Sequence, residues 1–140
     1  MLSNKVTQIM NKQVTTTAAS TPILDAMEKM AAENVGRVVI VANQMPVGIF
    51  TDHDILRRVI HRKFNIKKAS IGKVMTTPIR GVREDTHVLD VLRKMYRGKF
   101  RHMLVRNETG RMEGLVSIRR IFKLAVELGQ GASKTRTIGS

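Results

Sequence analysis

The segment Thr51–Asp54 combines the side chains of this chain that are most able to do chemistry: a hydroxyl, two carboxylates and an imidazole. Such a set could ligate a metal ion or act as a His/Asp catalytic pair. We expect neither, because consecutive side chains at the start of a helix point in different directions around its axis. The other histidines, His61, His87 and His102, show no metal-ligand spacing among themselves. The chain has no cysteine, which excludes thiolate metal sites, disulfides and cysteine nucleophiles.

Thr51 and Asp54 also suit the start of a helix. A threonine hydroxyl can cap the first free amides, and a carboxylate in the first turn complements the positive end of the helix dipole. An apolar, β-prone run over 47–50 precedes them, and a helix is predicted over 54–61. A helix cap and a binding site are therefore two interpretations of the same pair of residues.

The sequence repeats itself after 65 residues. Five residues recur at that spacing, and Gly48 recurs as Gly114 after 66 residues, which indicates one residue inserted in a turn. Self-similarity at a fixed period indicates a tandem duplication, here of roughly 60 residues. The five pairs are Met10 and Met75, Thr21 and Thr86, Asp25 and Asp90, Lys29 and Lys94, and Met30 and Met95.

Each copy predicts the order β-α-β-β-α, and hence a mixed α/β (α+β) fold. The helices have apolar residues at i, i+3, i+4, i+7 and i+8, the stripe of a helix that packs on a core. In the first copy we expect strands over 14–17, 38–41 and 47–50, a helix after the caps Ser20 and Thr21, and a helix over 54–61. In the second copy we expect strands over 79–82, 103–105 and 115–116, a helix after Asp85 and Thr86, and a helix over 119–128.

The duplication also predicts the domain organisation. We expect two repeats, over 6–65 and 66–128, that pack as one pseudo-two-fold unit, because one copy cannot bury all of its apolar faces. Residues 66–75 are predicted as an exposed, partly helical connector. Residues 129–140 have no apolar periodicity and are predicted as a disordered tail.

The chain is strongly basic, with a formal net charge of +14. Residues 1–65 carry 8 Lys/Arg and 5 Asp/Glu, whereas residues 66–140 carry 17 and 6. This excess predicts an anionic partner: nucleotide phosphates, nucleic acid or an acidic protein face. No signal-peptide pattern and no run of about 20 apolar residues is present, so we expect a cytoplasmic protein without a membrane partner.

Two basic runs bear on nucleic-acid binding. They permit contacts to phosphates, but such runs are usually solvated faces. With four Phe, one Tyr and no Trp, stacking platforms for bases are poorly supplied, and no helix-turn-helix or RNA-recognition signature is present. The sequence therefore favours a small nucleotide over nucleic acid. The runs comprise Arg57, Arg58, Arg62 and Lys63, and Arg93, Lys94, Arg97, Lys99 and Arg101.

The order of elements, with a glycine in the second hairpin strand and Thr-x-x-Asp before a helix, resembles the cystathionine-beta-synthase (CBS) domain. Two such copies in tandem resemble a CBS pair, or Bateman module, over about residues 6–128. The resemblance implies a non-catalytic regulatory module that binds an adenosine compound in a cleft between the repeats. AMP, ADP and ATP are preferred to S-adenosylmethionine or NAD as this regulatory ligand, and no further cofactor is expected.

The resemblance also implies which residues bind. The stretch from Gly48 to Asp54 matches the family's motif, in which the Thr and Asp hold phosphate and ribose. A carboxylate can accept hydrogen bonds from both ribose hydroxyls, and a hydroxyl beside free amides at a helix start suits a phosphate. Family analogy takes the other wall of the site from the second copy. The expected nucleotide-binding residues are Gly48, Ile49, Thr51, His53, Asp54, Thr77, Pro78, Ile79, Arg101 and His102.

The second copy departs from this motif. Its matching stretch places Ser117 and Arg120 where the first copy has Thr51 and Asp54. A guanidinium offers no acceptor to ribose hydroxyls, although it could fill the cleft or hold a phosphate. We therefore expect one working adenosine site in the chain.

Two functions stay open on the sequence alone. The first is a ligand sensor that changes shape or its affinity for an unidentified regulated protein. The alternative is a ligand-independent basic scaffold that binds nucleic acid or an acidic protein. The family resemblance also implies a homodimer, with apolar stripes at Ile55, Leu56, Val59 and Ile60 and at Ile121, Phe122 and Ala125 as its faces.

Overall fold

The computed structural model describes the backbone of residues 2–137 and the side chains of residues 2–129. The chain forms two compact units. One comprises residues 13–79 and is called the Asp54 unit. The other combines the residues up to Lys12 with those from Arg80 onward and is called the Arg120 unit.

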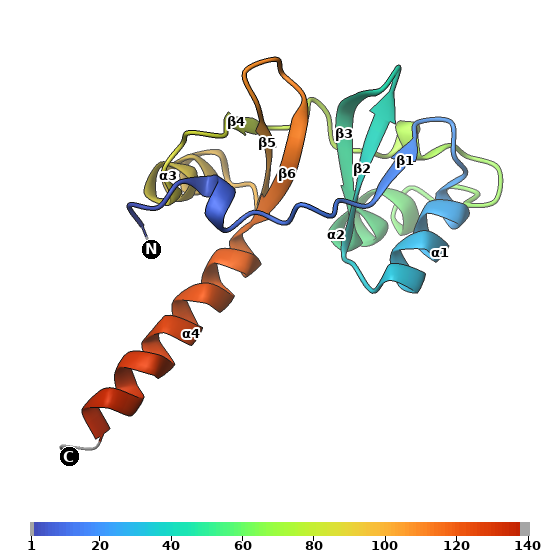
Figure 1. The fold of residues 1–140 in the computed structure, drawn as a ribbon. Helices are drawn as coiled ribbons and strands as arrows, with labels where there is room; N and C mark the ends of the chain where they lie inside the picture. The colour runs from blue at the N-terminus through green and yellow to red at the C-terminus, as the bar shows by residue number, and fades with distance from the viewer. Residues whose placement is uncertain (1, 138–140) are drawn as a thin grey trace. The chain divides into compact units, whose positions relative to one another are not determined.

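The Asp54 unit has a three-stranded sheet in the order β1-β2-β3 (Figure 1). β1 pairs with β2 in parallel, and β2 pairs with β3 in antiparallel register, with an irregularity between Ile40 and Val41. The chain then enters a short helical turn that continues as a π-helix. The elements are β1 (Thr16–Ala18), α1 (Ile23–Glu33), β2 (Arg37–Ala42), β3 (Met45–Thr51), α2 (Asp52–Asp54), η2 (Ile55–Ile60) and the 3₁₀ turn η3 (Ile71–Lys73).

The Arg120 unit repeats this plan. Its sheet has the order β4-β5-β6, with a parallel and then an antiparallel pair. The predicted order β-α-β-β-α is therefore confirmed in both copies. The elements are the 3₁₀ turn η1 (Val6–Gln8), β4 (Gly81–Arg83), α3 (Val88–Gly98), β5 (His102–Arg106), β6 (Met112–Ser117) and α4 (Ile118–Thr137).

Each core lies between one sheet and the apolar stripe of its first long helix. In the Asp54 unit, buried residues of α1 pack against buried residues of β2 and β3. In the Arg120 unit, α3 packs in the same way on β5 and β6. The predicted stripe is buried at i, i+3 and i+7, and half-buried at i+4, whereas the i+8 residues, Ala31 and Tyr96, are exposed and do not belong to the cores. The buried residues are Ile23, Ala26 and Met30 in α1, and Val88, Val91 and Met95 in α3.

A lead-in segment completes each unit. The lead-in of the Asp54 unit runs over 66–76 and contributes Ile71 and Val74 to its core, both fully buried. The lead-in of the Arg120 unit runs over 2–11 and contributes Val6 and Ile9. Residues 66–75 are thus not the exposed connector that the sequence predicts, because their apolar residues fill the core beside α1.

The lead-ins also satisfy the free amides at the starts of α1 and α3. The amides of Ile23 and Leu24 donate to the carbonyls of Ala69 and Ile66, both at 2.9 Å. The amides of Val88 and Leu89 donate to Asn4 and Leu2 at 2.9 and 3.1 Å. The predicted side-chain caps are not used. The N-cap residues are Pro22 in α1 and His87 in α3, and neither forms a side-chain cap hydrogen bond. The sequence predicts Ser20 and Thr21 for the first helix, and Asp85 and Thr86 for the second.

The compact units therefore do not follow the sequence repeats of 6–65 and 66–128. Residues 2–11 include the start of the first repeat but pack with the second, whereas residues 66–76 begin the second repeat and pack with the first. Each lead-in thus supplies apolar residues and carbonyls to the first long helix of the other repeat.

Helix α4 is longer than predicted. It runs to Thr137 (Figure 1), so residues 129–137 of the expected disordered tail are helical, and residues 138–140 lie outside the described residues. Extending an existing helix adds a hydrogen bond for each residue and needs no apolar stripe, which is why periodicity did not reveal it. Over residues 2–137 no helix is both long and apolar enough to cross a membrane.

A glycine in β3 allows the lead-in to approach the sheet. The amide of Ile49 donates to the carbonyl of Thr76 at 3.0 Å, and the amide of Thr76 donates back at 2.7 Å. A Cβ on Gly48 would lie 2.6 Å from the sulfur of Met75 and 2.9 Å from the Thr76 carbonyl oxygen. Gly114 in β6 has the same relation to Met10 and Asn11, which explains why both copies carry a glycine here.

We predict that Gly48→Ala destabilises the protein by about 1–3 kcal/mol, because the backbone of Thr76 must move to accept the methyl group. Urea denaturation monitored by circular dichroism measures the effect. Gly129→Ala is the control: nothing lies within 4 Å of its Cβ position in α4, so alanine should leave stability unchanged or raise it. Equal stability of Gly48→Ala and the wild type would contradict the close approach.

Candidate functional site

Asp54 is a buried carboxylate in α2, directly after β3, with 7% of its surface exposed. It is the third residue after Thr51, the N-cap of α2. The amide of Thr51 donates to its Oδ2 at 2.9 Å, and the hydroxyl of Thr51 lies 3.3 Å from the same oxygen. This is the carboxylate half of a capping box, so the helix-cap interpretation of the two residues is correct for this oxygen.

The other carboxylate oxygen, Oδ1, has only long contacts. The hydroxyl of Thr76 lies 3.5 Å from it, and Nε of Arg58 lies 3.7 Å from it. Strong hydrogen bonds to a carboxylate are shorter, at roughly 2.5–2.9 Å. A carboxylate has about four acceptor positions, so Oδ1 keeps most of its capacity for another donor. The two oxygens of Asp54 therefore have different roles: Oδ2 caps the start of the helix, and Oδ1 can accept a hydrogen bond from a ligand.

Arg58 and Thr76 connect this carboxylate to the lead-in. Nη1 of Arg58 donates to the carbonyl of Met75 at 2.8 Å while Nε faces Asp54. Sequence reasoning missed both residues as site residues. Arg58 has a local signal, because a residue four positions after Asp54 lies on the same helix face. Thr76 has none, since only the bridge to Ile49 brings it to the site.

The other predicted residues up to Ile79 lie in the Asp54 unit as well, including Thr77, Pro78 and Ile79, which the sequence assigned to the second copy. Gly48 and Ile49 form the bridge to Thr76, and the hydroxyl of Thr77 donates to the carbonyl of Val47 at 2.9 Å. The peptide bond between Thr77 and Pro78 is cis. Pro78 is exposed and Ile79 is half-buried, whereas His53 is exposed on α2. The bridge therefore brings together Gly48, Ile49, Thr51, Asp54 and Thr77. Among the described residues, the side chain of His53 forms no hydrogen bond or ion pair with them.

Arg101 and His102 belong to the Arg120 unit. Arg101 is exposed just before β5, and its carbonyl accepts the amide of Ile118 at 2.9 Å. His102 is half-buried at the start of β5, where it pairs with Ser117. Their part in a nucleotide site stays a prediction from the sequence.

Arg37 is a cation beside Thr51 that the sequence did not assign to this site. It is the residue directly opposite Thr51 in the antiparallel β2–β3 pair, so the two side chains emerge on the same face of the sheet. Burial of the half-buried guanidinium lowers the pKa of Arg37 from its ordinary value. The group remains a cation at neutral pH and can neutralise an anion held near Thr51.

The corresponding place in the Arg120 unit is built differently. Ser117, 7% exposed, accepts the amide of Arg120 at 3.0 Å. Nε of Arg120 donates to the carbonyl of Ile9 in the lead-in at 3.2 Å. The guanidinium thus bonds to the lead-in of its own unit and offers no acceptor. The two units share one frame, but only the Asp54 unit has a carboxylate in it.

A metal centre is not supported in the described part of the chain. Among those residues, no group of three or more His, Cys, Asp or Glu side chains could hold a metal ion. His53 and Asp52 are both exposed, although Asp52 donates its amide to the carbonyl of Gly36 at 2.9 Å. The chemistry available at Asp54 is therefore hydrogen-bond acceptance beside Arg58, with a second cation, Arg37, opposite Thr51 in the sheet.

The sequence matches one family model twice. The CBS domain model covers residues 6–61 and again residues 71–127. An uncharacterized 17.7 kDa protein of Acidianus ambivalens is 31% identical over 128 residues, which cover 91% of this chain and 76% of that protein. The CBS domain-containing protein CBSCBSPB1 of Arabidopsis thaliana is 33% identical over 127 residues, which cover 89% of this chain and only 23% of its length.

Solved structures share the fold. An uncharacterized conserved protein of Pyrococcus horikoshii has a TM-score of 0.82 at 25% identity, with 89% of this chain and 94% of that chain covered. The CBS domain pair of protein MJ0100, in complex with 5′-methylthioadenosine and S-adenosyl-L-methionine, has 0.78 at 25%, with 89% and 97% covered. PAE2072 of Pyrobaculum aerophilum, complexed with AMP, has 0.75 at 22%, with 88% and 99% covered, a likeness of fold alone. Because the family model matches both repeats and such pairs share the fold, the chain belongs to the CBS domain family.

Proposed function

We propose that the Asp54 unit binds the ribose of an adenosine nucleotide, and that the chain is a regulatory sensor of that ligand. The observation that carries this proposal is the buried Asp54 carboxylate, whose Oδ1 has no contact shorter than 3.5 Å among those recorded for the described residues. A ribose presents two neighbouring hydroxyl donors. Their hydrogen bonds to Oδ1 and to the free positions of Oδ2 would be charge-assisted and short.

The family supports an adenosine ligand. The CBS pair of MJ0100 is described with 5′-methylthioadenosine and S-adenosyl-L-methionine, and the similarly folded PAE2072 with AMP. These molecules share the adenosine moiety. We propose AMP, ADP or ATP for this chain, because its strong positive charge favours a ligand with phosphates.

Cations of the Asp54 unit would hold the phosphate. The half-buried Arg37 lies opposite Thr51 in the sheet, and Thr51 begins a helix, whose first amides can donate to an anion. Partial burial strengthens the attraction between a guanidinium and a phosphate, since water screens the pair less. In this proposal Asp54 contacts the ribose, and Thr51 and Arg37 contact the phosphate. Arg101 and His102 are further contacts predicted from the sequence.

Ligand binding would act on the lead-in. A ribose hydroxyl at Oδ1 competes with the hydroxyl of Thr76 and with Arg58, and Arg58 also binds the carbonyl of Met75. The ligand would thus change the hydrogen bonds that join residues 75–76 to the helix. A ligand shifts an equilibrium only by its differential affinity for two states, and this local competition supplies such a difference. In this proposal no bond of the ligand is broken, so the chain acts as a regulator and not as an enzyme.

We further propose that the chain forms a homodimer. The predicted stripes divide: Val59 and Ile121 are buried in the cores and Ile55 is half-buried against one of them, whereas the other members are exposed. Large apolar side chains exposed to this extent mark interaction surfaces when they gather on one element. The exposed fractions are 65% for Leu56 and 60% for Ile60 on η2, and 71% for Phe122 and 43% for Val126 on α4.

Adenosine nucleotides are expected to raise the thermal stability of the protein. At one hundred times the dissociation constant, the ligand adds about 2.7 kcal/mol to the free energy of unfolding. Asp54→Asn, which keeps the shape but loses the charge, should abolish the shift with AMP, ADP and ATP. Differential scanning fluorimetry measures it, with the exposed neighbour Asp52→Asn as the matched control. A shift of equal size in Asp54→Asn would refute the assignment of Asp54.

Charged substitutions on the exposed apolar residues are expected to break the dimer. Ile60→Asp combined with Phe122→Asp should convert a dimer into a monomer in sedimentation velocity, because each carboxylate would have to be buried in the interface. Met45→Asp is the control, since Met45, the first residue of β3, is 47% exposed. A wild-type monomer at micromolar concentration, or a dimer that survives both substitutions, would contradict the proposal.

A further inference from the structure

The outer face of α3 carries cations and an aromatic side chain. Val88, Val91 and Met95 are buried against the sheet, which leaves the opposite side of the helix to solvent. Arg93, Lys94 and Arg97 are exposed there. Tyr96, the one tyrosine of the chain, is 87% exposed beside them. An aromatic ring so fully exposed does nothing for the core of its own unit.

The duplication provides an internal comparison. Helices α1 and α3 have the same length and the same buried spacing, with each residue of α3 lying 65 positions after its counterpart in α1. The counterparts of Arg93, Tyr96 and Arg97 are Glu28, Ala31 and Ala32, all exposed. α1 keeps one cation, the exposed Lys29, where α3 has Lys94, but it performs the same structural task without the two arginines and the tyrosine, so the fold does not require them.

The cations of α3 are only partly neutralised. Arg93 forms an ion pair with Asp90 at 3.4 Å, and both side chains are exposed. No ion pair is recorded for Lys94 or Arg97 among the described residues. An open depression of about 490 Å³ adjoins the face, lined by Asp85, Thr86, His87, Asp90, Arg93, Lys94 and Arg97.

Further cations extend the charge beyond the end of the helix. Lys99 and Arg101 are exposed directly after α3. Arg80 lies over the ring of Phe100, 5.8 Å from its centroid, in a cation–π contact. A chain of phosphates that follows α3 would thus meet positive charge along and beyond the helix.

We propose that the outer face of α3 binds single-stranded nucleic acid, a function beyond the binding of a small nucleotide. Lys94, Arg97 and Arg93 would contact phosphates, and Tyr96 would stack on a base. This is the combination that single-strand binders use, because cations follow the backbone and an aromatic ring accepts any base. The sequence contains few aromatic residues for stacking, but the structure exposes the one tyrosine three residues after Arg93, on the neighbouring turn of α3. An acidic protein segment would use the same cations and leave the ring of Tyr96 without a matching group.

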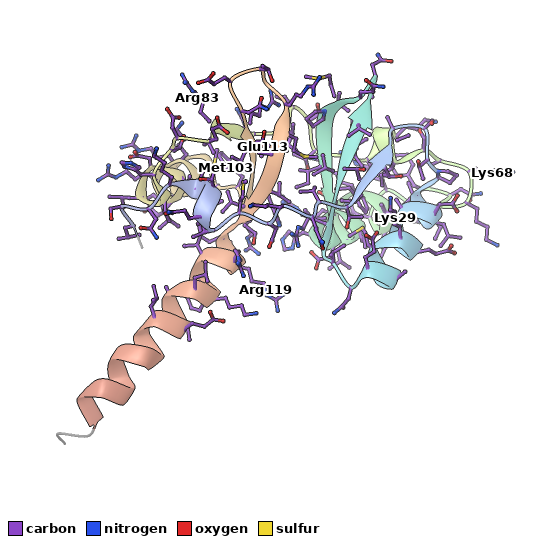
Figure 2. The ribbon with its side chains drawn as sticks, in the orientation of Figure 1. Lys29, Lys68, Arg83, Met103, Glu113 and Arg119 are labelled. Atoms are coloured by element: carbon purple, nitrogen blue, oxygen red, sulfur yellow. The ribbon has the colours of Figure 1, made fainter. Side chains whose placement is uncertain are left out.

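The test exchanges the α3 face for that of α1. The variant Arg93→Glu, Tyr96→Ala and Arg97→Ala installs the residues that α1 already carries, so it should fold. Fluorescence anisotropy with a labelled oligothymidine of 20 nucleotides measures binding at a series of salt concentrations. The control variant, Lys67→Glu with Lys68→Ala, removes the same amount of positive charge from the loop between η2 and η3, where Figure 2 shows Lys68 at the outer edge.

The wild type is expected to bind with a slope of about −2 in log affinity against log salt, since three cations would each displace counterions from the strand. The triple variant should bind at least tenfold more weakly (about 1.4 kcal/mol), and the control within twofold of the wild type. Tyr96→Ala alone should weaken binding about fivefold with the salt slope unchanged, because it removes stacking and no charge. Tyr96→Phe keeps the aromatic ring and, unlike Tyr96→Ala, should bind the oligonucleotide with the affinity of the wild type.

Four results would overturn the proposal. The first two are no binding of the oligonucleotide at 50 mM salt, and equal losses of affinity in the triple variant and the control. The third is an unaltered affinity for the oligonucleotide in Tyr96→Ala together with tight binding of an acidic peptide. The fourth is a changed oligomeric state of the triple variant. The last two would assign the face to an acidic protein and to a second copy of the chain, respectively. Circular dichroism verifies folding. The thermal shift with AMP should persist in the triple variant, so the failure of this proposal and that of the nucleotide site are distinguishable.

Discussion

The bridge between β3 and the lead-in is the constraint on which the Asp54 unit depends. Two hydrogen bonds, of 2.7 and 3.0 Å, join Ile49 to Thr76, and they form only because Gly48 leaves no Cβ in the way. The same segment fills the core with Ile71 and Val74 and supplies carbonyls to the first amides of α1. One approach of backbone to backbone thus completes the core, starts a helix and sets Thr76 beside Asp54.

The two duplicated units share the same backbone contacts but carry different side chains at the helix start. Both units have the glycine, the bridge and a hydroxyl at the helix start, but the third residue after the hydroxyl is Asp54 in one and Arg120 in the other. The carboxylate of Asp54 can still accept hydrogen bonds from a ligand, whereas the guanidinium of Arg120 donates to the carbonyl of Ile9 and offers no acceptor. The first long helices diverge as well, since α3 exposes Tyr96 and Arg97 where α1 has alanines. Shared backbone contacts preserve the fold and leave these positions free to differ.

The sequence predicted what depends on neighbours along the chain. The helical stripes, the hairpins and the pair Thr51 and Asp54 are local patterns with periods of 3.6, two and three residues, and they appear in the structure except at the i+8 positions of the stripes, Ala31 and Tyr96, which are exposed. The lead-in exchange, the main-chain caps of α1 and α3 and the approach of Thr76 to Asp54 were not predictable. They depend on carbonyls and amides, which every residue carries, so no side-chain type marks them. The exposed ring of Tyr96 needed the burial of Met95 to fix which side of α3 faces solvent.

The most direct test of the proposed sensor is an amide chemical-shift map of the labelled protein as AMP is added. Occupation of Asp54 Oδ1 predicts the largest changes at Thr51, Asp54 and Thr76, because a ligand there disturbs both the helix start and the bridge. Ser117 and Arg120 should change little, since Arg120 already holds the corresponding place. The account is contradicted if the changes centre on Ser117 and Arg120, or if Thr76 does not respond when Thr51 and Asp54 do.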